Sequence, residues 1–176
     1  MLKVLKTCKN ILEFFKEPII AVLVALIISQ FFVAHTTIPT GSMISTININ
    51  DHMFVSNIPF YYRNPERGEI VIFKYGEDNL VKRVIGLPGE TVDLKYGKVY
   101  INGEVLNEID YIRFPDTTYP QVVSFPYTIP EEHYFVMGDN RENSADSRSF
   151  GAISRDTIFS LGGYRVYPFN NMGIVD

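Results

Sequence analysis

The sequence has one cysteine, Cys8, and no tryptophan among its 176 residues. A single thiol cannot form an intramolecular disulfide, so the main domain must be stable without one. No group of His, Cys and Asp shows metal-ligand spacing, and we therefore expect no metal and no cofactor. The net charge is −4, and no basic face large enough to bind polyphosphate is evident, which excludes nucleic acid as an expected partner.

Charged residues are also absent from Pro18 to Asn50. Within this stretch the apolar run Pro18–Ala34 (PIIAVLVALIISQFFVA) is 17 residues long, near the lower limit for crossing a bilayer core of about 30 Å. Thr36–Pro39 can extend this run, because these residues carry no charge and burying them in a bilayer costs little free energy. The sequence thus predicts a transmembrane anchor over residues 18–37. Residues 1–17 would be a cytoplasmic segment, because four lysines precede the run and none follows it closely: Lys3, Lys6, Lys9 and Lys16.

Two other interpretations of the apolar run are possible. A cleaved signal peptide also begins with positive charge and an apolar stretch, but cleavage after Ala34 would place Phe32 where a small residue is needed. A buried core helix would need surrounding helices, and the downstream pattern predicts few. We favour an uncleaved anchor.

The rest of the chain, residues 38–176, has the pattern of one mainly β domain. Short apolar or alternating runs are separated by turn signals. Asn102-Gly103 predicts a two-residue hairpin, since both positions require positive φ. Phe114–Pro130 contains four prolines and predicts an irregular loop. The predicted strands are Met53–Ser56, Glu69–Lys74, Leu80–Ile85, Thr91–Leu94, Lys98–Ile101, His133–Met137 and Ile158–Val166.

Ser42 is a candidate nucleophile that follows Ala34, the last residue of the apolar run, by eight residues. It lies in Pro39-Thr40-Gly41-Ser42-Met43, where Gly41 gives the backbone freedom to expose the hydroxyl. A serine needs a nearby base before it becomes a strong nucleophile. Taken alone, this motif is a weak signal, and an ordinary solvated loop serine is the better interpretation of Ser42.

Lys82 is the candidate base. In the predicted strand it shares a face with Leu80 and Val84, while Arg83 faces the other way, so at most one of the two cations can simply point to solvent. Burial favours the neutral form of a lysine, and only the neutral amine can accept a proton. Arginine cannot be deprotonated in proteins. The alternative is a surface lysine on an edge strand with its amine in water.

A third polar block follows Gly138-Asp139-Asn140. Asp146 and Arg148 would share a face in a strand and could form a bidentate pair, and Ser144 lies close to them in sequence. A polar loop whose charges only hold one another is the alternative. A histidine base is less favoured, because His35, His52 and His133 lie in no recognisable motif.

Four blocks together resemble the type I signal peptidases, or leader peptidases, of the short, single-anchor bacterial kind. The resemblance covers nearly the whole chain and rests mainly on Ile38–Met43, Arg67–Phe73, Lys82–Glu90 and Gly138–Gly151. It implies a fold of coiled antiparallel β-sheets with an apolar surface resting on membrane lipid.

The resemblance also implies roles for individual residues. Ser42 would be the nucleophile and Lys82 the general base, and Thr40 would help to bind the oxyanion. Ser144 would orient the lysine amine, while Asp146 and Arg148 would brace the site. Shallow pockets for small substrate side chains would be lined by three residues: Ile38, Met43 and Val81.

Three positions depart from the family pattern. Ser45 stands where a proline is common, Thr40 replaces a serine and Glu90 replaces an aspartate. Thr40 keeps the hydroxyl, so oxyanion binding should survive. The loss of the proline loosens the chain after Ser42 and puts substrate range, rather than activity, in doubt.

The sequence therefore predicts a single-pass protein of the cell membrane with an extracytoplasmic catalytic domain. It would cleave signal peptides from secretory preproteins after small residues, with the substrate added as a strand beside Leu80–Val84. A peptidase dedicated to pilus or surface subunits, or an inactive anchored scaffold of the same fold, are the alternatives. A scaffold would need neither Ser42 nor Lys82.

Overall fold

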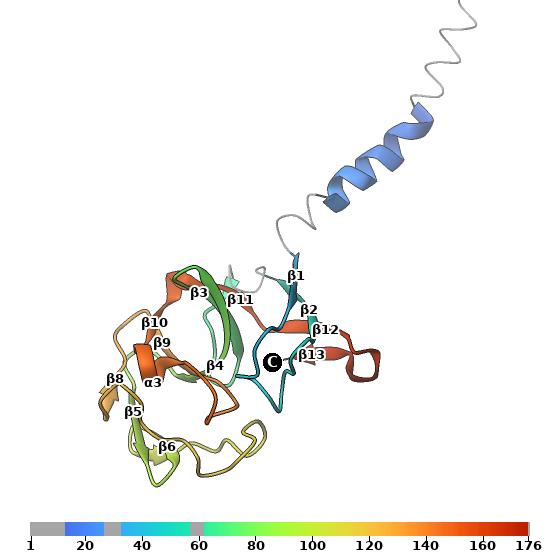
Figure 1. Cartoon of the computed structure of the whole chain (residues 1–176). Helices are drawn as coiled ribbons and strands as arrows, with labels where there is room; N and C mark the ends of the chain where they lie inside the picture. The colour runs from blue at the N-terminus through green and yellow to red at the C-terminus, as the bar shows by residue number, and fades with distance from the viewer. Residues whose placement is uncertain (1–12, 27–32, 57–61, 176) are drawn as a thin grey trace, which may run out of the picture. The chain divides into compact units, whose positions relative to one another are not determined.

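The computed structural model describes residues 13–26, 33–56 and 62–175. The chain divides into two compact units, Met1–Ala34 and His35–Asp176. The first contains an α-helix over residues 13–26 (Figure 1). Within the described ranges, no helix has both the length and the apolar character needed to cross a membrane.

The predicted anchor, residues 18–37, is therefore described only in part. Residues 27–32 lie outside the described ranges, and strand β1 (Val33–Thr37) replaces the predicted helical end of the segment. β1 lies beside strand β2 (His52–Ser56) in a sheet. Its β-branched residues Val33, Thr36 and Thr37 suit a pleated strand better than a helix.

The second unit is built from antiparallel sheets, which confirms the mainly β prediction. A five-stranded sheet has the order β10 (Ile153–Ser154), β9 (His133–Met137), β4 (Asp78–Gly86), β3 (Ile70–Tyr75), β11 (Ile158–Leu161). A four-stranded sheet has the order β1, β2, β12 (Gly163–Tyr167), β13 (Gly173–Val175). A second four-stranded sheet has the order β7 (Glu104–Val105), β6 (Lys98–Ile101), β5 (Thr91–Lys95), β8 (Tyr127–Thr128).

Three short helices complete the described part of this unit: α3 (Ser147–Phe150), η1 (Arg155–Thr157) and η2 (Phe169–Asn171). Figure 1 shows the β5–β6 hairpin at one end of the unit, away from β12 and β13. The predicted hairpin turn is confirmed, since Asn102 and Gly103 have φ of 51° and 88° and join β6 to β7. β8 lies inside Phe114–Pro130, for which the sequence predicts an irregular loop.

The predicted strand Ile158–Val166 is wrong in one respect, because it is two strands. Gly162 has φ of 60° and separates β11 from β12. A glycine adopts this conformation without a steric penalty. The chain can thus leave the five-stranded sheet at Leu161 and enter the β1–β2–β12–β13 sheet at Gly163.

The five-stranded sheet is buried on both faces. In β3, Ile70 and Ile72 pack into one hydrophobic cluster, while Val71 and Phe73 pack into another on the opposite face. Strand alternation explains this division of a continuous apolar run. β4 lies at the centre of this sheet, and it is exposed at its start but buried from Lys82 onward.

Candidate active site

The segment that carries Ser42 is anchored on both sides by buried apolar residues. Ile38 and Met43 belong to the same hydrophobic cluster. The Ile38 N–H donates to the Asp51 carbonyl at 3.1 Å, and the Ile47 N–H donates to the Met43 carbonyl at 2.8 Å. Ser42 therefore lies in an ordered turn, and its side chain is 8% exposed.

Lys82 reaches Ser42 from the middle of β4. Its Nζ lies 2.7 Å from Ser42 Oγ and donates to the Val81 carbonyl at 3.0 Å. The residue is 2% exposed. Leu80 and Val84 pack in one cluster on its face of the strand, as the alternation predicts. The alternative of a solvated surface lysine is thus wrong.

Burial lowers the pKa of Lys82 from its ordinary value of 10.5 to about 8, while the carboxylates of Asp146 and Asp139 act in the opposite direction. Loss of water outweighs the attraction of the two carboxylates, because an ammonium in an apolar interior loses most of its hydration. A substantial fraction of the amine is therefore neutral near pH 8. The arrangement pairs a hydroxyl with a base that can accept its proton.

The polar loop 138–146 packs directly against the Ser42 turn. The Asn140 N–H donates to the Ser42 carbonyl at 3.0 Å, and its side-chain amide donates to the Gly41 carbonyl at 2.9 Å. A Cβ on Gly138 would collide with the Ser42 carbonyl oxygen and with Ser144 Oγ. Only glycine allows this close approach of the two backbones.

Ser144 lies at the site but not in the expected hydrogen bond. Among the described residues its buried hydroxyl has no hydrogen-bond partner, so the contact with the Lys82 amine stays a prediction. Leaving a buried hydroxyl unpaired costs about 1–3 kcal/mol.

Asp146 and Arg148 form the predicted bidentate pair, but not in a strand. Asp146 is the N-cap of α3, and its carboxylate accepts from the Arg148 N–H. Arg148 Nε and Nη2 donate to it at 2.9 and 2.8 Å. The same carboxylate accepts from the Gly138 N–H at 3.1 Å. The first N–H groups of a helix have no partner within the helix, and the Asp146 carboxylate accepts from one of them, which favours a helix here.

Two further buried arginine–carboxylate pairs that involve the segments around the site were missed in the sequence. Arg83 donates to Asp139 through Nε and Nη2, both at 2.9 Å. Arg141 pairs with Glu108, with Nη2 2.5 Å from Oε1. Arg83, Arg141 and Asp139 lie in the quoted motifs, but nothing in their spacing identifies the partners.

The residues expected to contact substrate lie next to Ser42 and Lys82 in the sequence. Ile38 and Met43 are buried in the core, and Val81 packs partly exposed against the same cluster. Thr40 is exposed at the start of the Ser42 turn. The three histidines lie elsewhere: His35 Nε2 contacts His52 Nδ1 at 3.1 Å, and His133 Nδ1 contacts the Glu131 carbonyl at 2.8 Å. These contacts do not support a histidine base.

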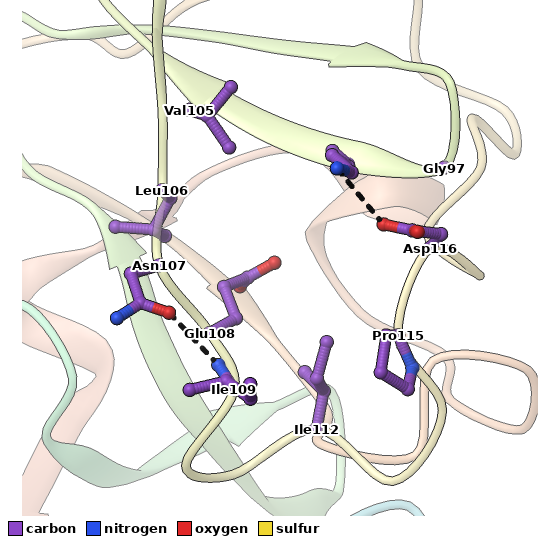
Figure 2. A pocket seen from close by; sticks show the side chains of 10 residues that line it. Gly97, Val105, Leu106, Asn107, Glu108, Ile109, Ile112, Pro115 and Asp116 are labelled. Carbon is purple, nitrogen blue, oxygen red and sulfur yellow. Dashed lines mark hydrogen bonds and ion pairs between the residues drawn. The ribbon is translucent and has the colours of Figure 1, made fainter.

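A cavity of about 370 Å³ lies apart from Ser42 and Lys82, between the β6–β7 hairpin and the loop that follows it (Figure 2). Neither Ser42 nor Lys82 lines it. Its walls are mainly apolar and hold no nucleophile next to a base. On chemical grounds the Ser42–Lys82 contact, and not the cavity, is the candidate active site. The lining residues are Gly97, Lys98, Val105, Leu106, Asn107, Glu108, Ile109, Ile112, Pro115 and Asp116.

Comparison with known proteins identifies the family of the chain. A family model described as "Signal peptidase, peptidase S26" matches residues 11–167. The chain belongs to the S26 signal peptidase family. Signal peptidase I S of Bacillus subtilis is 37% identical over 172 residues, which cover 93% of each chain. Signal peptidase I of Leptolyngbya laminosa is 36% identical over 178 residues, covering 96% of this chain and 85% of the relative.

A solved signal peptidase I from Enterococcus faecalis is 32% identical, with a TM-score of 0.48, and the match covers 56% of this chain and 97% of that one. Through its family the chain is an enzyme of the signal peptidase I class, a peptidase that acts on signal peptides.

Proposed function

We propose that the protein is a membrane-anchored serine endopeptidase in which Ser42 and Lys82 act as a catalytic dyad on secretory preproteins. The observation that carries this proposal is the 2.7 Å contact between Lys82 Nζ and Ser42 Oγ inside a buried site. A lysine can act as base only where its amine loses its proton near physiological pH. Burial lowers the pKa of Lys82 in that direction.

In this mechanism the neutral Lys82 amine takes the hydroxyl proton as Ser42 Oγ attacks the scissile carbonyl. The Ser42 N–H and the Thr40 hydroxyl stabilise the oxyanion, each contributing about 3 kcal/mol. Lys82 then gives the proton to the leaving amine, and the mature protein departs. Water, activated by the same amine, hydrolyses the acyl-enzyme and frees the signal peptide.

Ser144 holds the Lys82 amine in line during these transfers. A neutral amine has two N–H groups and one lone pair, so the Val81 carbonyl and the Ser144 hydroxyl can take the two hydrogens. The lone pair then points at Ser42. The unpaired state of Ser144 Oγ supports this role, because the hydroxyl is available within the site.

The substrate binds as an extended strand along the first half of β4. β4 pairs with β3 from Asp78 to Arg83, whereas its pairing with β9 begins only at Arg83. Among the described residues, the stretch before Arg83 thus has no strand on its second side. The position proposed from the sequence, Leu80–Val84, is shortened to Leu80–Lys82, because Val84 already pairs with Val136. Strand addition brings alternate substrate side chains to the Ser42 turn.

An apolar face supports a membrane-bound location. Phe54, Tyr164 and Ile174 are neighbours across β2, β12 and β13, and all three are exposed. Phe169 and Met172 add exposed apolar side chains beyond β12. A patch of this kind favours the headgroup layer of a bilayer. An anchor in the apolar segment that precedes β1 would hold this domain on the extracytoplasmic side, with the N-terminus in the cytoplasm.

The function is tested by cleavage of a signal-bearing preprotein by the full chain in lipid vesicles, with the product identified by N-terminal sequencing. We expect cleavage at a single position after a small residue. A bulky residue one or three positions before the scissile bond should reduce kcat/KM by about 100-fold. A bulky residue at position two should be tolerated, because its side chain points the other way. Equal restriction at positions one and two would contradict strand addition.

The pH dependence tests the role of the amine. Because the neutral form is active, kcat/KM should rise about tenfold per pH unit below the pKa and level off above about 8. At two units below this pKa about 1% of the maximal value remains. The profile is measured on a soluble peptide with the parent chain and with His35→Gln and His133→Gln. A rise centred near 6.5 that disappears in either histidine variant would disprove a lysine base.

A further inference from the structure

A second buried ion pair connects the polar loop of the site to a segment outside it. Glu108 begins the segment 108–118, which follows β7, and its carboxylate is buried although it also lines the cavity of Figure 2. It accepts from Arg141 Nη1 at 3.1 Å and from Nη2 at 2.5 Å. The Tyr111 hydroxyl donates to the same carboxylate at 3.0 Å.

Arg141 makes two further hydrogen bonds, one to segment 108–118 and one to loop 138–146. Nη1 also donates to Thr118 Oγ1 at 2.7 Å, which closes the segment around the guanidinium. Nε donates to the Gly138 carbonyl at 2.9 Å. Gly138 packs against the Ser42 carbonyl and Ser144 Oγ, so Arg141 holds the part of loop 138–146 that rests on the Ser42 turn.

The same segment also holds the other side of that turn. Ser45 Oγ donates to the Tyr111 carbonyl at 2.6 Å. Ser45 has φ of 116°, a strained conformation for a residue other than glycine, which persists only where its surroundings impose it. The Tyr111 ring lies 4.4 Å from the Arg83 guanidinium, which pairs with Asp139. Segment 108–118 thus contacts both loops that meet at Ser42.

We propose that Glu108 and Arg141 are positioning residues of the catalytic site, and that segment 108–118 acts through them to hold Gly138 and Ser144 against Ser42. This inference rests on the proposed function. A misplacement of about 1 Å in a catalytic group can cost about 100-fold in rate. Neither residue touches the reacting atoms, so loss of the pair should lower kcat and leave KM nearly unchanged.

The test compares two variants of the full chain in vesicles, with preprotein as substrate. Arg141→Ala should reduce kcat about 100-fold, with KM within about threefold of the parent value. Glu108→Gln keeps the shape but turns one acceptor toward Arg141 into a donor, and should reduce kcat about tenfold. The control is Glu90→Gln, which breaks the Arg67–Glu90 pair away from the dyad and should keep parental kcat.

Chemical rescue separates positioning from folding. About 50 mM guanidinium should raise kcat of Arg141→Ala about tenfold, because the ion occupies the space left by the missing guanidinium group. The same addition should not raise kcat of Ser42→Ala. If Arg141→Ala does not fold, the positioning role is tested with the isosteric Glu108→Gln variant alone. Parental kcat in folded Glu108→Gln, or a rise in KM that accounts for the whole loss, would overturn the proposal. A parent chain that does not cleave preprotein would instead overturn the proposed function.

Discussion

Ser42→Ala should lower kcat/KM for preprotein cleavage by at least about 10⁴-fold, because the variant cannot form the acyl-enzyme. The change removes one oxygen from a turn held by buried Ile38 and Met43, so the fold should remain. The residual rate reflects only substrate binding and oxyanion stabilisation. The measurement is kcat/KM on a fluorogenic peptide, together with preprotein cleavage followed by gel.

The control for this prediction is Ser154→Ala, in which the replaced hydroxyl caps η1 and not the site. Ser154→Ala should retain parental activity. Both variants should keep the circular dichroism of the parent. Cleavage by Ser42→Ala at more than about a thousandth of the parental rate would remove Ser42 from the role of nucleophile.

Lys82→Arg and Lys82→Met should also abolish cleavage, but with opposite effects on stability. Arginine stays protonated at all accessible pH values and cannot act as base, and methionine has no basic group. The amine of Lys82 carries a penalty for burial that methionine would not carry. Since the pKa falls from 10.5 to about 8, charging this amine in the folded protein costs about 3 kcal/mol.

The pH dependence of this penalty has a definite sign. Between pH 8 and 10.5 the unfolded chain binds more protons at this site than the folded chain, so the parent gains stability as pH rises through this window. Lys82→Met should therefore be more stable than the parent by about 3 kcal/mol below pH 8, and the difference should vanish above about 10.5. Lys82→Arg should be less stable than the parent at pH 9, because its charge cannot be lost.

Denaturant unfolding of the three chains in the same detergent at pH 6, 9 and 10.5 measures these differences, and other titrating groups cancel between parent and variant. A Lys82→Met chain that is less stable than the parent at pH 6 would mean that the amine stabilises the fold. Measurable turnover by Lys82→Arg would exclude Lys82 as the base.

Local features of the fold could be predicted from the sequence because neighbouring residues determine them. Asn102-Gly103 specifies its hairpin by the φ values that its two residues allow. The apolar alternation around Lys82 placed it between Leu80 and Val84, as the structure has it. The strand break at Gly162 could not be predicted, because the apolar run from Ile158 to Val166 continues across it and only the packing of two sheets separates its halves.

The features of the site also separate into those that follow from the sequence and those that depend on the tertiary structure. The sequence by itself determined which residues are chemically able to act: a hydroxyl after Gly41, an amine among apolar residues, and a polar block with Asp146 and Arg148. Tertiary structure alone decided that Ser42 and Lys82, 40 residues apart, lie 2.7 Å from each other. It also decided the pKa of Lys82 and the pairing of Arg83 with Asp139 and of Arg141 with Glu108. Burial and the pairing of charges that are distant in sequence arise only when the chain folds, so they cannot be predicted from any single stretch of the sequence.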